Sequence, residues 1–203
     1  MRVVIVDSGG TNIASIQYAF RRLGVQAALS HAADEITCAD RVILPGVGAA
    51  AAAMQRLHMH GLAEVVQNLR QPVLGICLGM QLLYESSAEG DVNCLGLIPG
   101  RVVDLRTSQT EKSCDVIWPH MGWNAMQIEA TTDPLFTGIE SGAHFYFVHG
   151  YAAPVNDYAK AVSMHGTAFT AVCQRDNVIG IQCHPEKPGV VGEQFLANFL
   201  GIE

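Results

Sequence analysis

The sequence is poor in charge, and poorest in positive charge. Of its 203 residues only 15% are charged, and 12 Lys and Arg stand against 19 Asp and Glu, which gives a net charge of −7. The longest basic run is the pair Arg21-Arg22. Because a nucleic-acid-binding surface needs a basic face, we expect no direct binding to DNA or RNA.

The sequence also lacks long apolar runs and paired metal-binding motifs. No segment offers about 18 consecutive apolar residues, so we expect no membrane span. The six cysteines form no CxxC pair and fit no zinc spacing. His58 and His60 lie in a predicted helix, where residues two apart diverge, so we expect no metal there. The amino terminus shows no signal-peptide pattern, and we expect free thiols and a cytoplasmic location.

Apolar residues are plentiful and are arranged for an α/β fold. They make up 49% of the chain, and a chain of this length can bury roughly 70% of its unfolded surface. We expect a single domain over residues 1–203. In the first half, strand-like runs alternate with helical periodicity, which predicts βαβ crossovers and a parallel sheet. The elements predicted here are strands at 2–6, 26–30, 41–45 and 72–76, and helices at 12–23, from 49 onwards and at 78–87.

The second half predicts antiparallel strands added to that sheet. Asp176 and Asn177 supply a hairpin turn between two of them. The predicted fold class is therefore α/β, with a mostly parallel central sheet flanked by helices and antiparallel strands in the C-terminal half. The elements predicted here are strands at 101–105, 143–152, 159–164, 169–174 and 178–183, and a last helix at 191–200.

A cysteine between two glycines is the first sign of chemistry. The stretch Gly75-Ile76-Cys77-Leu78-Gly79 lies between a predicted strand and a predicted helix. The related G-x-S-x-G elbow presents its nucleophile on a strained turn of this kind, and glycines permit such a turn. The helix N-terminus would favour a thiolate and could bind an oxyanion. The alternative is a buried structural cysteine.

A base and an acid follow the last predicted strand, in His184-Pro185-Glu186. Pro185 stiffens the bend, and Glu186 falls on the same side as His184 in an extended segment. A carboxylate there could hold the imidazole in one tautomer. Together with Cys77 these residues form a candidate nucleophile, base and orienting acid. Taken alone, the tripeptide is a weak signal, and a surface loop is its default interpretation.

A glycine-rich loop follows the strand at 41–45. Gly46, Val47 and Gly48 lie at the carboxyl end of a parallel strand, where α/β sites gather. Their N–H groups could complete an oxyanion hole that begins at the N–H of Leu78. The alternative is a simple strand-to-helix turn.

Three stretches, PGVG, GICLGMQLL and HPE, occur in this order and resemble the class I glutamine amidotransferases over the whole chain. The resemblance implies a flavodoxin-like amidotransferase fold and no cofactor. It implies that Cys77 attacks the side-chain amide of glutamine and that His184 protonates the departing ammonia. Water then hydrolyses the thioester to glutamate.

Two more stretches, PHMGWN at 119–124 and HFYFVHGYA at 144–152, resemble the imidazole glycerol phosphate synthase family. This resemblance implies a partner, a (β/α)8-barrel cyclase subunit of that synthase in histidine biosynthesis. Ammonia made at Cys77 would pass through the barrel. The cyclase would then form imidazole glycerol phosphate and aminoimidazole carboxamide ribotide.

The resemblance assigns roles to individual residues. It implies an oxyanion hole of Val47, Gly48 and Leu78; glutamine contacts at Gly46, Gln81, Glu89, Gly150 and Tyr151; and partner contacts at Trp123, Asn124, Tyr146, His149 and Lys187. Glu89 would pair with the α-ammonium of glutamine, and its alternative is a solvated helix-end acid. His120 and Met121 complete the motif without an assigned role.

The sequence departs from the family pattern at four positions: Ser8, Thr11, Gly150 and Cys183. Gly150 replaces a common Ser or Thr, so its backbone would have to serve in place of a hydroxyl. Cys183 stands beside the candidate base, at a position where the family more often has Phe. We interpret Cys183 as a small core residue. None of the four belongs to the Cys-His-Glu set.

Other functions stay open at this stage. One alternative is another amidotransferase subunit, or a cysteine hydrolase or peptidase on the same scaffold. Another is a non-catalytic binding protein, in which Cys77→Ala would leave every function intact. We also expect the isolated subunit to be nearly inactive, because the peptide of the PGVG loop can rotate and a partner would favour one orientation.

Overall fold

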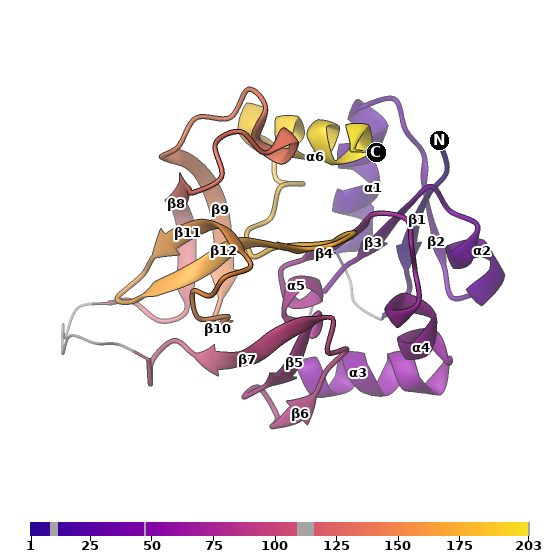
Figure 1. Ribbon diagram of the computed structural model, residues 1–203, viewed down its shortest axis with the longest axis horizontal. Coiled ribbons are helices and arrows are strands. Elements are labelled where there is room, and N and C mark those ends of the chain that lie inside the picture. The colour runs from indigo at the N-terminus through magenta and orange to yellow at the C-terminus, as the bar shows by residue number, and fades with distance from the viewer. Residues whose placement is uncertain (9–11, 47, 109–115, 203) are drawn as a thin grey trace.

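A computed structural model describes residues 1–8, 12–46, 48–108 and 116–202 of the chain (Figure 1). The helical elements are α1 (Ile13–Arg22), α2 (Ala33–Thr37), α3 (Ala50–Met59), α4 (Leu62–Gln67), α5 (Leu78–Leu82), the 3-10 helix η1 (Pro134–Phe136) and α6 (Val190–Gly201). The strands are β1 (Val3–Val6), β2 (Ala27–Ser30), β3 (Arg41–Leu44), β4 (Val73–Ile76), β5 (Tyr84–Ser87), β6 (Val92–Asn93), β7 (Ile98–Asp104), β8 (His120–Ile128), β9 (Ala143–His149), β10 (Tyr151–Ala152), β11 (Ala159–Met164), β12 (Ala168–Arg175) and β13 (Val178–Ile181).

The large sheet has a parallel half and an antiparallel half. Its strand order is β2-β1-β3-β4-β13-β12-β11-β8-β9. The strands from β2 to β13 pair in parallel, and those from β13 to β9 pair antiparallel. The predicted fold class, with antiparallel strands added in the C-terminal half, is confirmed. The single domain over 1–203 stays a prediction.

Alternation along the buried strands divides the apolar residues between two cores. In β1, Val3 and Ile5 pack into one core, and Val4 and Val6 pack into the other. Helices α1 and α6 contribute to the first core, and α2, α3 and α4 to the second. Figure 1 shows the two groups of helices above and below the sheet. Both faces of the parallel half are therefore covered.

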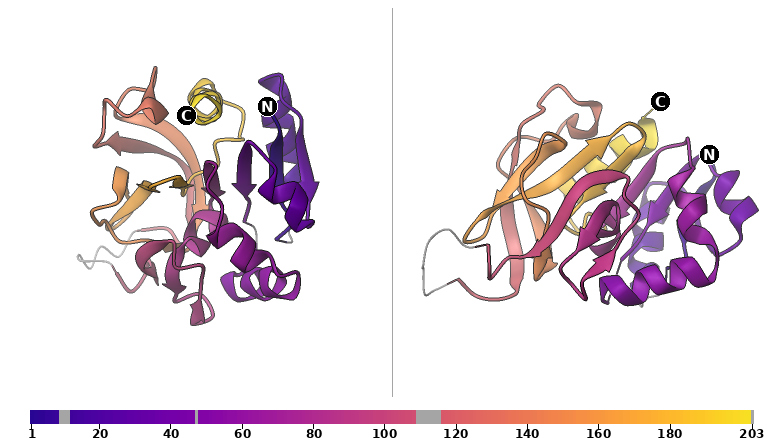
Figure 2. Two further views of the ribbon diagram at one scale, coloured as in Figure 1. Left: turned by 45° about the vertical axis from the view of Figure 1, so that its right-hand side comes forward. Right: turned by 60° about the horizontal axis from the view of Figure 1, so that its bottom comes forward.

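A second, four-stranded sheet has the order β10-β7-β5-β6. In Figure 2 it lies beside α3, on the same face of the large sheet. The predicted strand at 143–152 is divided between the two sheets, because β9 ends at His149 and β10 begins at Tyr151. The chain thus passes from one sheet to the other at Gly150.

Two sequence predictions of secondary structure were wrong, and one long strand was missed. The helix predicted at 78–87 ends at Leu82, and residues 84–87 form β5, which pairs with β6 and β7. The helix predicted from 49 onwards is interrupted at Gly61, whose φ of 66° is left-handed. Strand β8 was not predicted at all, although it makes a seven-residue pairing with β9.

Two further expectations concern membrane spans and the state of the cysteines. No helix among the described residues is long and apolar enough to cross a membrane. Five cysteines, Cys38, Cys77, Cys94, Cys173 and Cys183, are free thiols. The sixth, Cys114, lies outside the described residues, as does Thr11.

Candidate active site

Cys77 occupies a tight turn between β4 and α5. Its φ of 54° and ψ of −111° are unusual for a residue with a side chain, and such strain is typical of functional turns. Its backbone N–H donates to the carbonyl of Ile181 at 2.8 Å, which ties the turn to β13. The side chain is 8% exposed.

The flanking glycines are required by close backbone contacts. A Cβ on Gly75 would lie 2.7 Å from the carbonyl oxygen of Gly79. A Cβ on Gly79 would overlap the carbonyl of Leu44, and one on Gly46 would overlap the backbone of Gly79. The glycine-rich loop after β3 is therefore packed directly against the Cys77 turn, and only glycine allows that approach.

His184 and Glu186 follow β13 and contact one another. Nδ1 of His184 lies 2.8 Å from Oε1 of Glu186, and both side chains are buried, at 7% and 3% exposure. The amide of Asn12, at the start of α1, donates to the same oxygen at 3.1 Å. The carboxylate is thus held in place and in turn orients the imidazole.

The remaining ring nitrogen of His184, Nε2, is buried and has no conventional hydrogen-bond partner among the described residues. Burial disfavours a charge on the ring, but short-range interactions with Cys77 and Glu186 outweigh burial and raise the pKa of His184 to about 10. The ring is therefore suited to hold a proton beside the sulfur. The hydrogen bond between a catalytic base and its nucleophile is often long before substrate binds.

Two adjoining cavities meet at Cys77. One, of 240 Å³, is lined by Cys77, Gln81, Glu89, Val148, Gly150 and Tyr151, among others. The other, of 360 Å³, is lined by Cys77, His184, Tyr146 and Lys187, among others. Gly46 and Gly48 also line the second cavity, and Leu78 lines both. The structure thus gathers most of the predicted site residues around one sulfur.

Polar side chains in the first cavity have defined partners. The amide nitrogen of Gln81 donates to the carbonyl of Tyr151 at 2.8 Å and to Oε1 of Gln182 at 3.0 Å. Glu89 is partly exposed and accepts from the N–H of Ala50, at the start of α3, at 2.9 Å. Glu89 nevertheless lines the same cavity as Cys77, where a cationic group of a ligand could meet its carboxylate.

The candidate oxyanion hole is only partly described. Leu78 begins α5, so its N–H belongs to the free N-terminus of that helix. Gly48 has a φ of 93° and lies in both cavities. Val47 lies outside the described residues. The role of these three residues stays a prediction.

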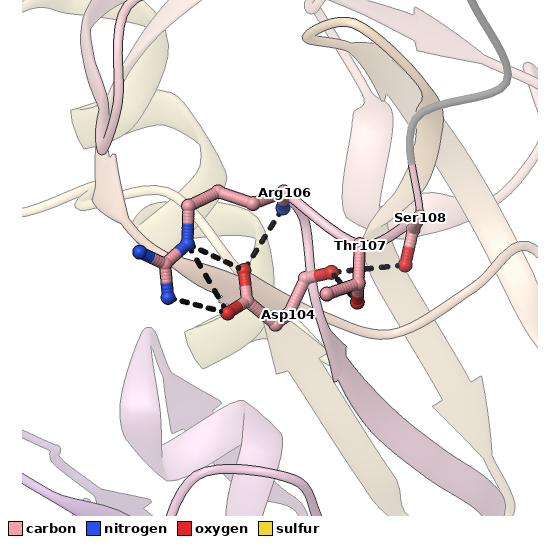
Figure 3. A network of polar contacts seen from close by, with 4 residues as sticks. All are labelled: Asp104, Arg106, Thr107 and Ser108. Carbon is pink, nitrogen blue, oxygen red and sulfur yellow. Dashed lines mark hydrogen bonds and ion pairs between the residues drawn. The ribbon is translucent and has the colours of Figure 1, made fainter.

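Gly150 is packed against Trp118, a residue whose role the sequence did not reveal. A Cβ on Gly150 would lie 2.6 Å from the indole ring, so the ring occupies the space of a side chain there. The guanidinium of Arg106 lies 5.1 Å from the centre of the same ring, and Asp104 holds Arg106 with contacts of 2.7 to 3.2 Å (Figure 3). Hydrogen bonding to Arg106 lowers the pKa of Asp104.

The residues predicted to contact a partner fall into two groups. Trp123 is 56% exposed and packs edge-on against Tyr146, and Lys187 lies 5.2 Å from the centre of the Tyr146 ring. Asn124 is half-buried. His149 is only 6% exposed, so it is buried and does not belong to this exposed group.

Two residues of the site could not be picked out from the sequence. Asn12 was treated only as the start of a helix, and Gln182 only as part of a strand. Gln182 is fully buried, and its amide lies 3.8 Å from Sγ of Cys77. A polar residue in the otherwise apolar run at 178–183 was the one available signal. For Asn12, 174 residues from Glu186, no sequence signal existed.

No group of three or more His, Cys, Asp or Glu side chains suited to hold a metal ion occurs in the described part of the chain. His58 and His60 lie at the C-terminal end of α3, and His60 packs against His31.

Comparisons with known proteins agree with this geometry. The family profile described as glutamine amidotransferase class-I matches residues 4–202. The imidazole glycerol phosphate synthase subunit HisH of Shewanella oneidensis is 44% identical, over 99% of this chain and 96% of its own length. The proteins of that name from Xylella fastidiosa and Xanthomonas axonopodis pv. citri are 46% and 48% identical, over 99% and 98% of this chain and 98% and 96% of their own lengths.

Solved structures with much lower identity share the fold. PurLQS from Thermotoga maritima aligns with a TM-score of 0.72 at 20% identity, over 98% of this chain and 97% of its own. A glutamine amidotransferase from the same organism aligns with a TM-score of 0.63 at 16% identity, over 99% of this chain and 83% of its own.

Proposed function

The chain belongs to the class I glutamine amidotransferase family, and we propose that it is the glutaminase subunit of an imidazole glycerol phosphate synthase. It releases ammonia from glutamine for use by a cyclase partner. The observation that carries this proposal is the placement of Cys77, on a strained turn, beside a His184 that Glu186 orients.

In the first half-reaction, the thiolate of Cys77 attacks the side-chain amide carbon of glutamine. A C–S bond forms, and the carbonyl oxygen becomes an oxyanion that the N–H groups of Leu78 and the Gly46–Gly48 loop stabilise. His184 then gives its proton to the amide nitrogen, the C–N bond breaks, and ammonia leaves. The thioester of Cys77 remains.

In the second half-reaction, neutral His184 takes a proton from water as the water attacks the thioester. The C–S bond breaks, glutamate leaves, and the thiolate and imidazolium are restored. Glu186 keeps Nδ1 of His184 protonated throughout, so that Nε2 is the nitrogen that exchanges protons. The net reaction consumes glutamine and water and produces glutamate and ammonia.

Glutamine binds in the 240 Å³ cavity. Its side-chain carbonyl lies at Cys77, and its α-ammonium lies at Glu89, which lines the same cavity. Gln81, Gly150 and Tyr151 complete the wall. Because Trp118 fills the space beside Gly150, only the backbone is available to hold substrate at that position.

The partner is a (β/α)8-barrel cyclase that docks on the surface formed by Met121, Trp123, Tyr146 and Lys187. Met121 and Trp123, both on β8, are 61% and 56% exposed, and grouped apolar exposure of this kind is typical of interaction sites. Tyr146 and Lys187 also line the 360 Å³ cavity at Cys77. Ammonia therefore has a short route from the thioester to the docked barrel. A cytoplasmic location, which the free thiols favour, belongs to the same proposal.

Labelling with a glutamine-like diazoketone tests the proposal. We expect alkylation of Cys77, enhanced when the cyclase is present, with mass spectrometry locating the modified residue. Cys183 is the internal control, because it is fully buried and burial raises its pKa well above the usual value. Alkylation confined to Cys183, or full glutaminase activity in Cys77→Ala, would contradict the proposal.

A non-catalytic binding protein and a peptidase receive no support from the site, and the relatives named above favour this synthase over another amidotransferase. A non-catalytic role leaves the strained Cys77 turn and the buried His184–Glu186 pair unexplained. A peptidase would have to accept a chain in the 240 Å³ cavity, whereas an amino acid matches it in size. Glutamine turnover without peptide cleavage is the expected result of a direct assay.

A further inference from the structure

Two buried histidines lie side by side on strands β8 and β9. His120 and His149 are directly opposite in the antiparallel pairing and are 3% and 6% exposed. Nδ1 of His120 lies 3.0 Å from Nε2 of His149. Neither residue takes part in the proposed reaction, and a buried polar pair of this kind requires further partners.

Those partners are present at both ends of the pair. Nδ1 of His149 lies 2.9 Å from the carbonyl oxygen of Tyr151. Nε2 of His120 lies 3.1 Å from the amide nitrogen of Asn124. The same amide nitrogen donates to the carbonyl of Met164 at 2.8 Å, and the amide oxygen accepts from the N–H of Ala125 at 2.8 Å. Every nitrogen of the two rings therefore has a partner.

The partners determine the direction of the chain of hydrogen bonds. A carbonyl only accepts, so Nδ1 of His149 carries a proton and its Nε2 accepts from Nδ1 of His120. An amide nitrogen only donates, so Nε2 of His120 accepts from Asn124. Both rings are therefore neutral, and both carry their proton on Nδ1.

The chain of hydrogen bonds ends at the glutamine cavity. The carbonyl of Tyr151 accepts from His149 and also from the amide of Gln81 at 2.8 Å. Gln81 also binds Gln182, whose amide lies 3.8 Å from the sulfur of Cys77. Gln81, His149 and Tyr151 all line the 240 Å³ cavity.

We propose that Asn124, His120 and His149 are positioning residues for glutamine binding: their directional chain of hydrogen bonds fixes the Tyr151 carbonyl, and through it Gln81, in the cavity wall. The need is local. Gly150 has no side chain to anchor the crossing between the two sheets. Backbone pairing holds His149 to β8 and Tyr151 to β7, and the N–H of Leu105 donates to the Gly150 carbonyl at 3.1 Å. The side-chain bonds from His149 and Gln81 then act on the carbonyl of Tyr151, a residue of the cavity wall. The inference rests on the proposed function, because it assumes that glutamine occupies the cavity.

The surrounding charges favour the neutral rings. The titratable groups that act on His149 are His120 on β8, His165 between β11 and β12, and His184 after β13. Burial, together with His120, His165 and His184, lowers the pKa of His149 to about 3, although its bond to Tyr151 opposes the change. Burial and His165 lower the pKa of His120 to about 4. The His165 ring is stacked on His120, with centroids 4.1 Å apart.

The first test needs no substitution. Nitrogen NMR of the wild-type chain, labelled at histidine, reads the tautomer of each ring directly. We expect His120 and His149 to be neutral and protonated on Nδ1 at pH 7. Protonation of either ring on Nε2, or of both nitrogens, would overturn the proposal whatever the activity of the protein.

The second test uses steady-state glutaminase kinetics of the complex with saturating cyclase. His149→Leu removes the donor to Tyr151, and we expect the KM for glutamine to rise about tenfold with kcat within about threefold of wild type. His149→Asn keeps a donor near the Nδ1 position and should return KM to within about threefold. His144→Asn, an exposed residue on the same strand, is the matched control.

The outcomes separate the two proposals. If folded His149→Leu keeps the wild-type KM, or if it loses kcat alone, the positioning role is refuted and the glutaminase function stands. If Cys77→Ala keeps full activity, the proposed function fails while the NMR result still decides the tautomers. Should His149→Leu not fold, His120→Leu and His120→Asn provide the same comparison one step further from the cavity.

Discussion

Four glycines of the site lie where a side chain would overlap a neighbouring group. Gly46, Gly75 and Gly79 each lie where a Cβ would overlap neighbouring backbone, and Gly150 lies where one would overlap an indole ring. The first three glycines are part of the motifs that identify the family. Gly150 departs from the family pattern, and the Trp118 ring occupies the space that a side chain would need there.

Gly150→Ser should therefore destabilise the protein. The new side chain would lie 2.6 Å from Trp118, and forced overpacking of this kind costs about 1–3 kcal/mol of unfolding free energy. Urea denaturation measures the change. Adding Trp118→Leu should restore most of the loss, and Gly201→Ser, where the structure leaves open space, should change little. Equal losses in the single and double variants would show that the overlap is not the cause.

His120 and His149 should make the protein sensitive to acid. Burial lowers the pKa of each well below 6.5, to about 4 and about 3, so the folded state stays neutral while the unfolded state binds protons. Their contribution to stability is complete above about pH 6.5 and is lost as the pH falls toward 4. Between pH 7 and pH 5, His120→Asn should lose about 1–2 kcal/mol less unfolding free energy than wild type. The exposed His58→Asn serves as control, and parallel pH curves for all three proteins would refute the expectation.

At the scale of elements, junctions between strands and helices matter more than the elements themselves. The first turn of α5 is pressed against the end of β3 through Gly79 and Leu44. This contact brings the glycine-rich loop and Cys77 together. The helix is only five residues long, so its position depends on packing and not on its own stability.

Gly79→Ala should push the first turn of α5 away from the end of β3. The added methyl group overlaps the Leu44 carbonyl, so we expect a loss of about 3 kcal/mol or more in unfolding free energy and a large loss of glutaminase activity. Thermal unfolding and glutamine turnover are the two measurements. Gly201→Ala, in the last turn of α6, tests whether any glycine in a helix behaves in this way. A stable, active Gly79→Ala would contradict the packing described here.

The same scale shows why some elements were predicted and others were not. Strands β1, β3 and β4 are short β-branched or apolar runs buried on both faces, a pattern that the sequence displays directly. Residues 84–87 continue the α5 segment in sequence but become β5, because β7 offers a strand to pair with. Strand β8 mixes polar and apolar residues and includes Gly122, so its pairing with β9 and β11 defines it. Tertiary contacts override local propensity in both cases.

At the scale of the whole molecule, three exposed apolar side chains gather around the start of β8 and the start of α6. Met121, Trp123 and Val190 are all more than half exposed, and a Cβ on Gly189 would contact the Trp123 ring. This group adjoins Tyr146 and Lys187, which line the cavity at Cys77. The proposed docking surface therefore lies beside the cavity that contains Cys77.

Trp123→Ala should weaken binding of the cyclase at least tenfold. An exposed Trp in an interface is a frequent centre of binding energy, and its removal costs about 2 kcal/mol or more. Titration calorimetry with the purified cyclase measures the Kd. Tyr18→Ala on α1 removes an equally exposed aromatic ring, 57% against 56%, and should leave the Kd unchanged. Similar weakening by both substitutions would argue against this docking surface.

The residues of the proposed triad could be picked out from the amino-acid order alone. The proposed nucleophile, base and acid each stand in a stretch of a few residues, where glycine or proline restricts the local backbone, so each short stretch is recognisable by itself. Their convergence, and the contacts that support them, were decided by folding. Asn12 meets Glu186 across 174 residues, His120 meets His149 across 29, and Trp118 meets Gly150 between elements. Such pairs leave no periodic trace in the chain, because they arise only when separate strands and loops are packed around the same cavity.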